Sequence, residues 1–274
     1  MKKFIFKSLV FLTFTILFVY LFSSFILHTK IFKLNYYPGK EIYTAIEKSK
    51  KINSSTTLLI GDSVANQIFN NEEEYDQFNS LATNQAISIA GQYFLLKEYL
   101  KTGNKIDSLI MLFVPWSFKN NLNQKYTYHY FLKPFYNSDY SALFSKTVLG
   151  QIEKLEYNLV SQFPPIKIIP WAPEFSATSS SDFTFLSPIS VEYLNKISQL
   201  SKQYNFSVKI IPPPISFERK LLIESIDKSE ILQTELSSEL LEYFEKIKYL
   251  DKSNFSDGTH LINPKNYNSI INHD

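Results

Sequence analysis

The chain contains no cysteine and only four histidines among its 274 residues. The absence of cysteine excludes disulfides, thiolate zinc sites, a cysteine nucleophile and a lipidated cysteine, although it leaves the redox compartment open. The histidines include no second pair at metal-ligand spacing, and no acid cluster lies beside them. We therefore predict neither a metal nor another cofactor.

The chain also lacks a large net charge of either sign. The formal net charge is +2, which gives no electrostatic footprint for nucleic acid, so nucleic acid is not an expected partner. Hydrophobic residues make up 45% of the chain and aromatic residues 16%. That composition is sufficient for a sizeable buried core in a chain of this length.

No charged residue occurs from Ser8 to Leu27. Twenty helical residues rise about 30 Å, which matches the hydrocarbon thickness of a bilayer. A cleaved signal peptide has a shorter apolar region of about 7–15 residues and ends in small residues such as Ala-x-Ala. We therefore predict an uncleaved transmembrane anchor over residues 1–33, followed by a juxtamembrane connector over 34–52 that spaces the domain from the bilayer.

Lysines flank this apolar run, and more of them precede it than closely follow it. Because positive residues are retained on the cytoplasmic side, this bias predicts a single-pass protein of the cell membrane with a cytoplasmic N-terminus. The rest of the chain is then expected to be extracytoplasmic.

The remaining residues, 53–274, alternate short apolar runs with segments of helical periodicity. Strands that alternate with helices require a parallel sheet, so this pattern predicts a three-layer α/β/α sandwich with a flavodoxin-like strand order. An aromatic-rich insertion is expected at about 119–186, on the carboxyl edge of the sheet. The predicted strands are 56–60, 81–88, 106–114, 208–211 and 247–250, and one long helix is expected over 220–246.

The stretch from Thr56 to Phe69 reads TTLLIGDSVANQIF and predicts a strand, a tight turn and a helix start. Gly61 allows the turn, and either Asp62 or Ser63 can cap the helix. A serine at this position stands at the carboxyl end of a strand, where backbone N–H groups of the first helical turn face any negative charge that forms. That placement suits an acyl-transfer nucleophile, whereas the simpler alternative is ordinary helix capping.

A second stretch, from Asn254 to Leu261, reads NFSDGTHL. Asp257 and His260 lie three residues apart in a loop, so the carboxylate can hold one imidazole nitrogen while the other faces a serine hydroxyl. A metal site built on the same two residues is a weaker alternative. Right-handed crossovers bring the ends of the first and last predicted strands to one edge, which allows Ser63 and His260 to meet.

Together, GDS near the start of the domain and DGTH near its end resemble the SGNH/GDSL hydrolase superfamily. The resemblance spans roughly residues 56–272, although only its two ends are specific. It implies that Ser63 is the nucleophile, His260 the general base and Asp257 the residue that orients the base. The expected activity is that of a serine esterase or O-acyltransferase.

The resemblance also implies an oxyanion hole, which the chain matches less well. Ser63 is expected to contribute its backbone N–H. Where the superfamily usually has a glycine donor, this chain has Ser88 or Ile89, with Gly91 just beyond. Where the superfamily usually has an asparagine, this chain has Ser117. The hydroxyl of Ser117 could donate, Asn120 or Asn121 could reach back, or the hole could be incomplete.

The Pro-Trp stretch after the third predicted strand and the N-terminal anchor resemble the alginate O-acetyltransferase-like and D-alanyl-lipoteichoic acid biosynthesis proteins. This looser resemblance implies an acylated glycan of the cell envelope as substrate and a membrane-bound O-acyltransferase as a partner. The alternative is a non-catalytic domain that keeps the fold and binds or assembles glycans without turnover.

Overall fold

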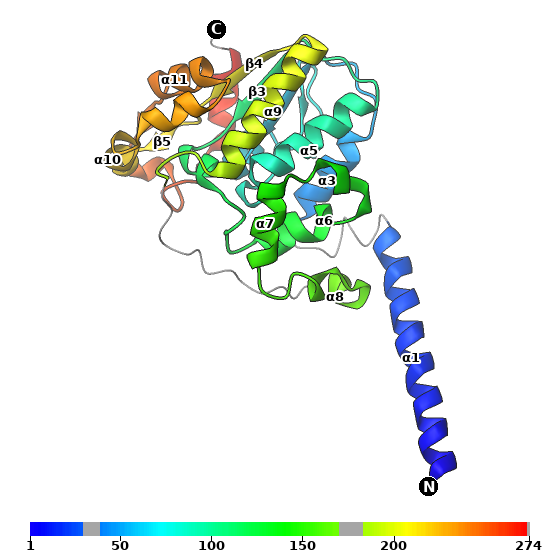
Figure 1. Cartoon of the computed structure of the whole chain (residues 1–274). Helices are drawn as coiled ribbons and strands as arrows, with labels where there is room; N and C mark the ends of the chain where they lie inside the picture. The colour runs from blue at the N-terminus through cyan, green and yellow to red at the C-terminus, as the bar shows by residue number, and fades with distance from the viewer. Residues whose placement is uncertain (30–38, 170–182, 273–274) are drawn as a thin grey trace.

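The computed structural model describes residues 1–29, 39–169 and 183–272. It is a mixed α/β structure built on a four-stranded parallel sheet with the order β2-β1-β3-β4. A separate two-stranded parallel sheet, β5-β6, lies beside α10 and α11, apart from the main sheet (Figure 1). The strands are β1 (Thr57–Gly61), β2 (Asn79–Ser80), β3 (Ser108–Leu112), β4 (Ser207–Ile211), β5 (Ile215–Ser216) and β6 (Tyr249–Leu250).

Helices of very different lengths precede and connect these strands. The α-helices are α1 (Lys2–His28), α3 (Lys40–Ser49), α4 (Ser63–Ile68), α5 (Ser88–Lys101), α6 (Lys133–Phe135), α7 (Lys146–Lys154), α8 (Pro164–Ile168), α9 (Pro188–Tyr204), α10 (Lys220–Glu224) and α11 (Ser237–Glu245). The short 3-10 segments are η1 (Gln85–Ile87), η2 (Pro115–Lys119), η4 (Ser138–Leu143), η5 (Val160–Gln162), η6 (Phe217–Arg219), η7 (Lys228–Gln233), η8 (Lys252–Asn254) and η9 (Pro264–Asn272), and η3 (Tyr128–Leu132) is a π-helix.

Successive residues of the central strands β1 and β3 face opposite sides of the sheet, as the pleat requires. Leu58 and Ile60 of β1 join a large core cluster that also contains residues of α3, α5, α9 and α11. Leu59 of β1 and Ile110 of β3 join a smaller cluster with α4, and residues of η9 pack against it. Both faces of the sheet are thus covered, which explains why the strands read as continuous apolar runs.

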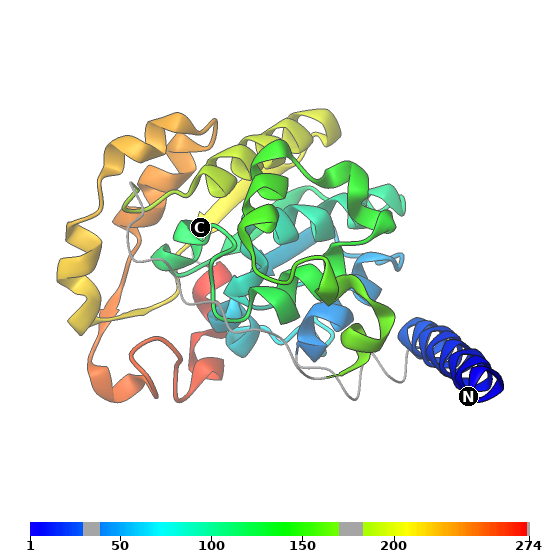
Figure 2. The same ribbon diagram turned by 60° about the horizontal axis from the view of Figure 1, so that its bottom comes forward.

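Helix α1 projects away from the folded domain (Figures 1 and 2). It is long and apolar enough to cross a membrane, with a mean hydropathy of 2.3 over its most apolar window. Its large apolar side chains are mostly exposed, as for Phe11 at 73% and Phe18 at 67%. The length and composition of α1 are those of the expected anchor, although part of residues 1–33 lies outside the described residues.

Several predicted elements differ from the observed ones. The strand expected over 81–88 is wrong: β2 is the short pair Asn79–Ser80, and the chain then turns into η1 and α5. Asn84 accepts a hydrogen bond from the Ala86 N–H, and this Asx-type contact starts a helical turn where alternation indicated a strand. The expected fifth strand pairs with β5 rather than with the main sheet. The long helix over 220–246 is broken into α10, η7 and α11.

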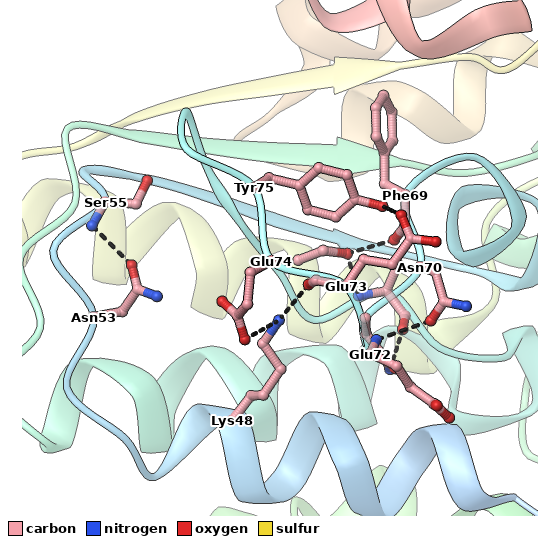
Figure 3. A network of polar contacts seen from close by, with 12 residues as sticks. Lys48, Asn53, Ser55, Phe69, Asn70, Glu72, Glu73, Glu74 and Tyr75 are labelled. Atoms are coloured by element: carbon pink, nitrogen blue, oxygen red, sulfur yellow. Dashed lines mark hydrogen bonds and ion pairs between the residues drawn. The ribbon is translucent and has the colours of Figure 1, made fainter. Parts of the chain in front are cut away.

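The connector expected over 34–52 contains a helix that belongs to the folded domain. In α3, Ile42 and Ala45 are completely buried, and the helix packs against α5. Figure 3 shows Lys48 of α3 reaching the acidic loop after α4, where its Nζ donates to the Glu73 carbonyl at 3.1 Å and pairs with Glu74 at 3.7 Å. The apolar stripe of α3 therefore fixes it to the core, and its lysine secures the loop that follows α4.

Most of the aromatic side chains in the expected insertion pack into the core. Phe131, Phe135 and Tyr140 are buried, and their rings lie 5.6–5.9 Å from the ring of Phe94 in α5. Such edge and stacked contacts between aromatic rings stabilise a core beyond simple burial. The Pro-Trp-Ala-Pro stretch at 170–173 lies outside the described residues.

The turn after β1 has no room for a side chain at Gly61. A Cβ there would overlap the Ala65 methyl group and the Leu112 carbonyl oxygen. We therefore expect Gly61→Ala to lower the free energy of unfolding by about 1–3 kcal/mol or more, the usual cost of overpacking a core. Chemical denaturation of the full chain in detergent, followed by circular dichroism, measures the change.

Gly150→Ala provides a matched control because it makes the same substitution at a position within helix α7 with nothing nearby to clash. There alanine should raise the free energy of unfolding by about 0.5–1 kcal/mol, since glycine is unfavourable in a helix. Equal stability of the two variants would contradict the described packing at Gly61.

Candidate active site

The turn between β1 and α4 presents Ser63 at the carboxyl end of the sheet. Asp62, not Ser63, caps α4: its Oδ1 accepts hydrogen bonds from the N–H groups of Val64 at 2.9 Å and Ala65 at 3.3 Å. The Ser63 Oγ lies instead 2.9 Å from Nε2 of His260. Asp62 therefore caps the helix, so capping does not account for Ser63. The Ser63 hydroxyl points at an imidazole.

The carboxyl group of Asp62 also joins the end of β1 to the segment after β3. Its Oδ2 accepts hydrogen bonds from the Val114 N–H and from the Ser117 hydroxyl, each at 2.7 Å. Asp62 has no exposed surface. Burial raises the pKa of Asp62 above its ordinary value, and the four hydrogen bonds it accepts oppose that rise. Three of the four partners are backbone N–H groups, which can only donate, so the hydrogen bonds favour the ionised carboxylate while burial opposes it.

The loop that carries His260 is closed on itself. Phe255 and Leu261 form an isolated antiparallel bridge, and the Ser256 N–H donates to the His260 carbonyl at 2.8 Å. Gly258 at its tip has φ +78°, a left-handed conformation that glycine adopts without strain. The glycine of the DGTH motif therefore allows the turn that brings Asp257 back towards the imidazole.

Helix α4 holds this loop in place. The side-chain oxygen of Gln67 accepts a hydrogen bond from the Leu261 N–H at 3.2 Å. Gln67 is four residues after Ser63, so the two side chains lie on the same face of α4. Leu261 and Phe255 are buried in the cluster that contains Val64. One helix thus positions both the serine and the loop that presents the histidine.

Asp257 orients the imidazole from its other side. Its Oδ2 lies 2.7 Å from His260 Nδ1, while its Oδ1 accepts the N–H groups of Thr259 at 3.0 Å and His260 at 2.8 Å. Partial burial opposes ionisation, but these hydrogen bonds outweigh it and lower the pKa of Asp257 to about 2. An ionised carboxylate only accepts hydrogen bonds, so Nδ1 carries the proton and Nε2 is left to accept the Ser63 hydroxyl proton.

The expected oxyanion donors differ in whether their backbone N–H groups are already hydrogen-bonded. The Ser63 N–H makes no hydrogen bond within the described residues and remains free for a ligand. The Ser88 N–H donates to the Gln85 carbonyl, and the Ser88 Oγ accepts a hydrogen bond from the Ala90 N–H at 3.2 Å. Gly91 lies buried inside α5, where helical N–H groups bond to the preceding turn. Of these three residues, Ser63 alone presents a free backbone N–H.

Two of the remaining expected donors make hydrogen bonds within the scaffold. Ser117 directs its hydroxyl to Asp62, as described above, with a longer 3.4 Å contact to Gln85. The Asn120 amide donates to the Gln85 carbonyl at 2.5 Å, which fixes the loop after β2. Asn121 has a buried side-chain oxygen without a hydrogen-bond partner among the described residues. Among the described residues, no hydrogen bond joins any of these three side chains to the Ser63 hydroxyl.

His129, the other histidine that could act as a base, lies in η3 within the insertion. Burial, together with the nearby charge of Lys133, lowers the pKa of His129 to about 4. A neutral, partly buried imidazole without an acid partner does not form a catalytic pair. Within the described residues no group of three or more histidine, cysteine or acidic side chains could hold a metal ion.

Sequence reasoning missed a cation and an aromatic ring beside the histidine loop. The Arg219 guanidinium carbon lies 5.6 Å from the Trp116 ring centroid. One of its terminal nitrogens is 3.9 Å from the position that a Cβ on Gly258 would occupy. Trp116 also lines a cavity of about 300 Å³ together with Pro115, Leu222 and Ile226. The Pro-Trp stretch was visible in the sequence, whereas nothing in the sequence connected Arg219 to it.

The loop after β2 places Asn84 near the same edge of the sheet. The Thr83 N–H donates to the Gly61 carbonyl at 2.9 Å, so the next residue follows β2 close to the turn before Ser63. The Asn84 side-chain oxygen accepts the Ala86 N–H, and its amide NH₂ makes no hydrogen bond within the described residues. Asn84 is thus a second candidate donor that the pattern of superfamily motifs did not indicate.

No protein-family model matches this chain, and no curated protein is similar to it in sequence. The site is therefore supported by its geometry alone.

Replacement of Ser117 separates its two possible roles. Ser117→Ala removes one of four hydrogen bonds to a buried carboxyl group, so we expect the free energy of unfolding to fall by about 1.5–3 kcal/mol, the usual range for hydrogen bonds to charged groups. Ser190→Ala is a matched control, because Ser190 is a buried serine that donates to a neutral carbonyl. Its loss should cost less, about 0.5–1.5 kcal/mol. Unchanged stability with a 10²-fold lower kcat would instead identify Ser117 as an oxyanion donor.

Proposed function

We propose that this chain is a membrane-anchored serine esterase or O-acyltransferase that acts on acyl esters. The observation that carries the proposal is the continuous hydrogen-bonded chain from Ser63 Oγ through His260 to Asp257. A hydroxyl, an imidazole and a carboxylate in this order form the arrangement that activates serine in acyl transfer. A structural role for the same contacts would not require the serine to be solvent-accessible, and Ser63 is only partly buried.

Each side chain then has one step to perform. The Ser63 Oγ attacks the acyl carbonyl carbon while His260 Nε2 takes its proton, and the negative charge forms on the carbonyl oxygen. The free N–H of Ser63 is placed to donate to that oxygen. His260 returns the proton to the departing alcohol oxygen, which leaves an acyl group on Ser63. Water or a sugar hydroxyl then attacks this acyl-enzyme, with His260 as its base, and this choice separates hydrolysis from transfer.

The proposal includes membership of the SGNH/GDSL hydrolase superfamily. Its support is the match of GDS and DGTH to residues that meet in space, and the strand order β2-β1-β3-β4, which follows the first four positions of a flavodoxin-like sheet. With helices on both faces of this sheet, we assign the domain to the three-layer α/β/α sandwiches. The expected fifth strand, which is β6 in the structure, departs from that plan because it pairs with β5 and not with the main sheet.

The proposed substrate is an acylated glycan or glycoconjugate of the cell envelope. The side chains of His260 and Asp257 are 31% and 55% exposed, so the site is open enough for a polymer. Trp116 offers an aromatic face of the kind that stacks on sugars, and Arg219 beside it offers a cation for an anionic group. A membrane-bound O-acyltransferase is the proposed partner, as the source of the acyl group in the transfer reaction.

Substitution of Ser63 tests the mechanism. Ser63→Ala should reduce turnover of a generic acetyl ester by several orders of magnitude, because it removes the atom that bonds to the acyl group. Ser145→Ala is the matched control, since Ser145 caps α7 through a hydrogen bond to the Val148 N–H. It should cost only about 0.5–2 kcal/mol of stability and leave turnover intact.

An organophosphonate probe should label Ser63 in the wild-type chain and fail to label Ser63→Ala. Turnover by Ser63→Ala equal to the wild type would exclude the mechanism. A folded wild type that neither reacts with the probe nor cleaves esters or acetylated glycans would favour the alternative, a non-catalytic domain that binds or assembles glycans.

We further propose that α1 is an uncleaved anchor with a cytoplasmic N-terminus and that the domain is extracytoplasmic. In right-side-out membrane vesicles, added protease should digest the domain, and the full-length chain should stay with the membranes through a high-salt wash. Protease digestion only in inverted vesicles would reverse the orientation. Recovery of a soluble form cut near residue 27 would replace the anchor by a signal peptide.

A further inference from the structure

One short helix of the domain packs on the membrane-spanning candidate itself. Helix α8 contacts α1, and Ser23 is the buried residue of α1, at 1% exposure. Figure 1 shows α8 beside the domain-proximal part of α1. We take Ser23, the buried residue of α1 among the described residues, as the point where α8 packs, because small residues let helix backbones approach closely where membrane helices pack together. This contact fixes α8 relative to any bilayer that α1 crosses.

The position of the contact along α1 determines the depth of α8. Ser23 lies four residues before Leu27, the last residue of the uncharged run. Four residues of helix correspond to about 6 Å along its axis. If the uncharged run spans the hydrocarbon core, α8 therefore lies at the boundary between acyl chains and headgroups on the domain side.

The residues around α8 suit that boundary. Large apolar side chains, which rarely cluster on a surface that faces water, are exposed here. Leu159 is 72% exposed, Phe163 57% and Tyr157 58%. Val160 and Ile169 add further exposed apolar surface at 44% and 39%. Between residues 157 and 169 the sequence contains no acidic residue, and its one charged residue is Lys167. We call residues 157–169 the α8 segment.

The α8 segment is attached firmly to the domain. The Lys133 Nζ of α6 donates to the Ile169 carbonyl at 2.9 Å, and Ser161 is buried at 2% exposure. Burial lowers the pKa of Lys167 to about 8, because desolvation disfavours the charged ammonium.

We infer that the α8 segment lies in the interface of the bilayer that α1 spans, so that the domain rests on the membrane surface. The occupant of its exposed apolar face is lipid, because α1 carries this face to the level where acyl chains begin. Interfacial segments of this kind bind in proportion to the apolar area that they bury. The inference depends on α1 crossing a membrane and is independent of ester chemistry at Ser63.

The absence of native cysteine makes a direct test possible. Leu159→Cys in the full chain, labelled with an environment-sensitive nitrobenzoxadiazole group, reports on the α8 segment in phosphatidylcholine nanodiscs. Leu232→Cys is a matched control because Leu232 is equally exposed, at 73% against 72%. It lies in η7, which packs on α11 at a distance from α1 (Figures 1 and 2). Both sites are exposed, so neither substitution should disturb folding, and circular dichroism checks this.

We expect a shallow spin-labelled lipid to quench the label at 159 several-fold more than the label at 232, and aqueous iodide to show the opposite order. Equal access of iodide to both labels would overturn the inference. So would protection of the label at 159 that appears in detergent and rises with protein concentration, because a second copy of the chain would then cover the face. Hydrogen exchange of the unlabelled chain in nanodiscs provides a second measurement: amides 157–169 should exchange more slowly than in detergent, and unchanged rates would also overturn it.

Discussion

The buried carboxyl group of Asp62 holds the serine side of the site together. It joins three parts of the chain that meet at the carboxyl edge of the sheet: the first turn of α4, Val114 after β3, and Ser117 in η2. A buried carboxyl group is tolerated only when hydrogen bonds replace those it made to water, and Asp62 has four. The direction in which Ser63 points is a consequence of this arrangement, because the turn has little freedom once Asp62 is fixed and Gly61 packs against Ala65 and the Leu112 carbonyl.

The histidine side of the site depends on weaker and more local contacts. Its loop follows β6, which belongs to the small sheet rather than to the main one. It reaches Ser63 through packing of Leu261 and Phe255 on α4 and through the hydrogen bond between Gln67 and the Leu261 N–H. The two halves of the site are therefore assembled by one six-residue helix, which contacts the main sheet at one end and η9 along its side.

Sequence patterns indicated the parts of this site whose residues are close in the chain. Asp257 and His260 are three residues apart, and a glycine between them permits the left-handed turn, so their pairing follows from local geometry. The parallel sheet and the strand at Thr57–Gly61 follow in the same way from apolar runs bounded by turn residues. The catalytic role of these residues stays a prediction.

The patterns did not indicate contacts between residues that are distant in the chain. The oxyanion role of Ser117 stays a prediction, and no local rule shows that its hydroxyl donates to a buried carboxyl group 55 residues earlier. Likewise, the alternation over 81–88 indicated a strand, but the Asn84 side chain turned the backbone into a helix. Arg219 comes to lie by Trp116 only because β5 and the short helices after it run past the histidine loop.

The separation of the two sheets also affects how the site can be lost. Serine and histidine are 197 residues apart, and no hydrogen bond of the main sheet includes the histidine loop. A local opening that frees η9 and the loop from α4 would part them while β1, β3 and β4 stay paired. Local openings of this kind require less free energy than global unfolding. The lifetime of the assembled site therefore depends on the contacts that the histidine loop and η9 make with α4. It does not depend on the stability of the sheet that carries the serine.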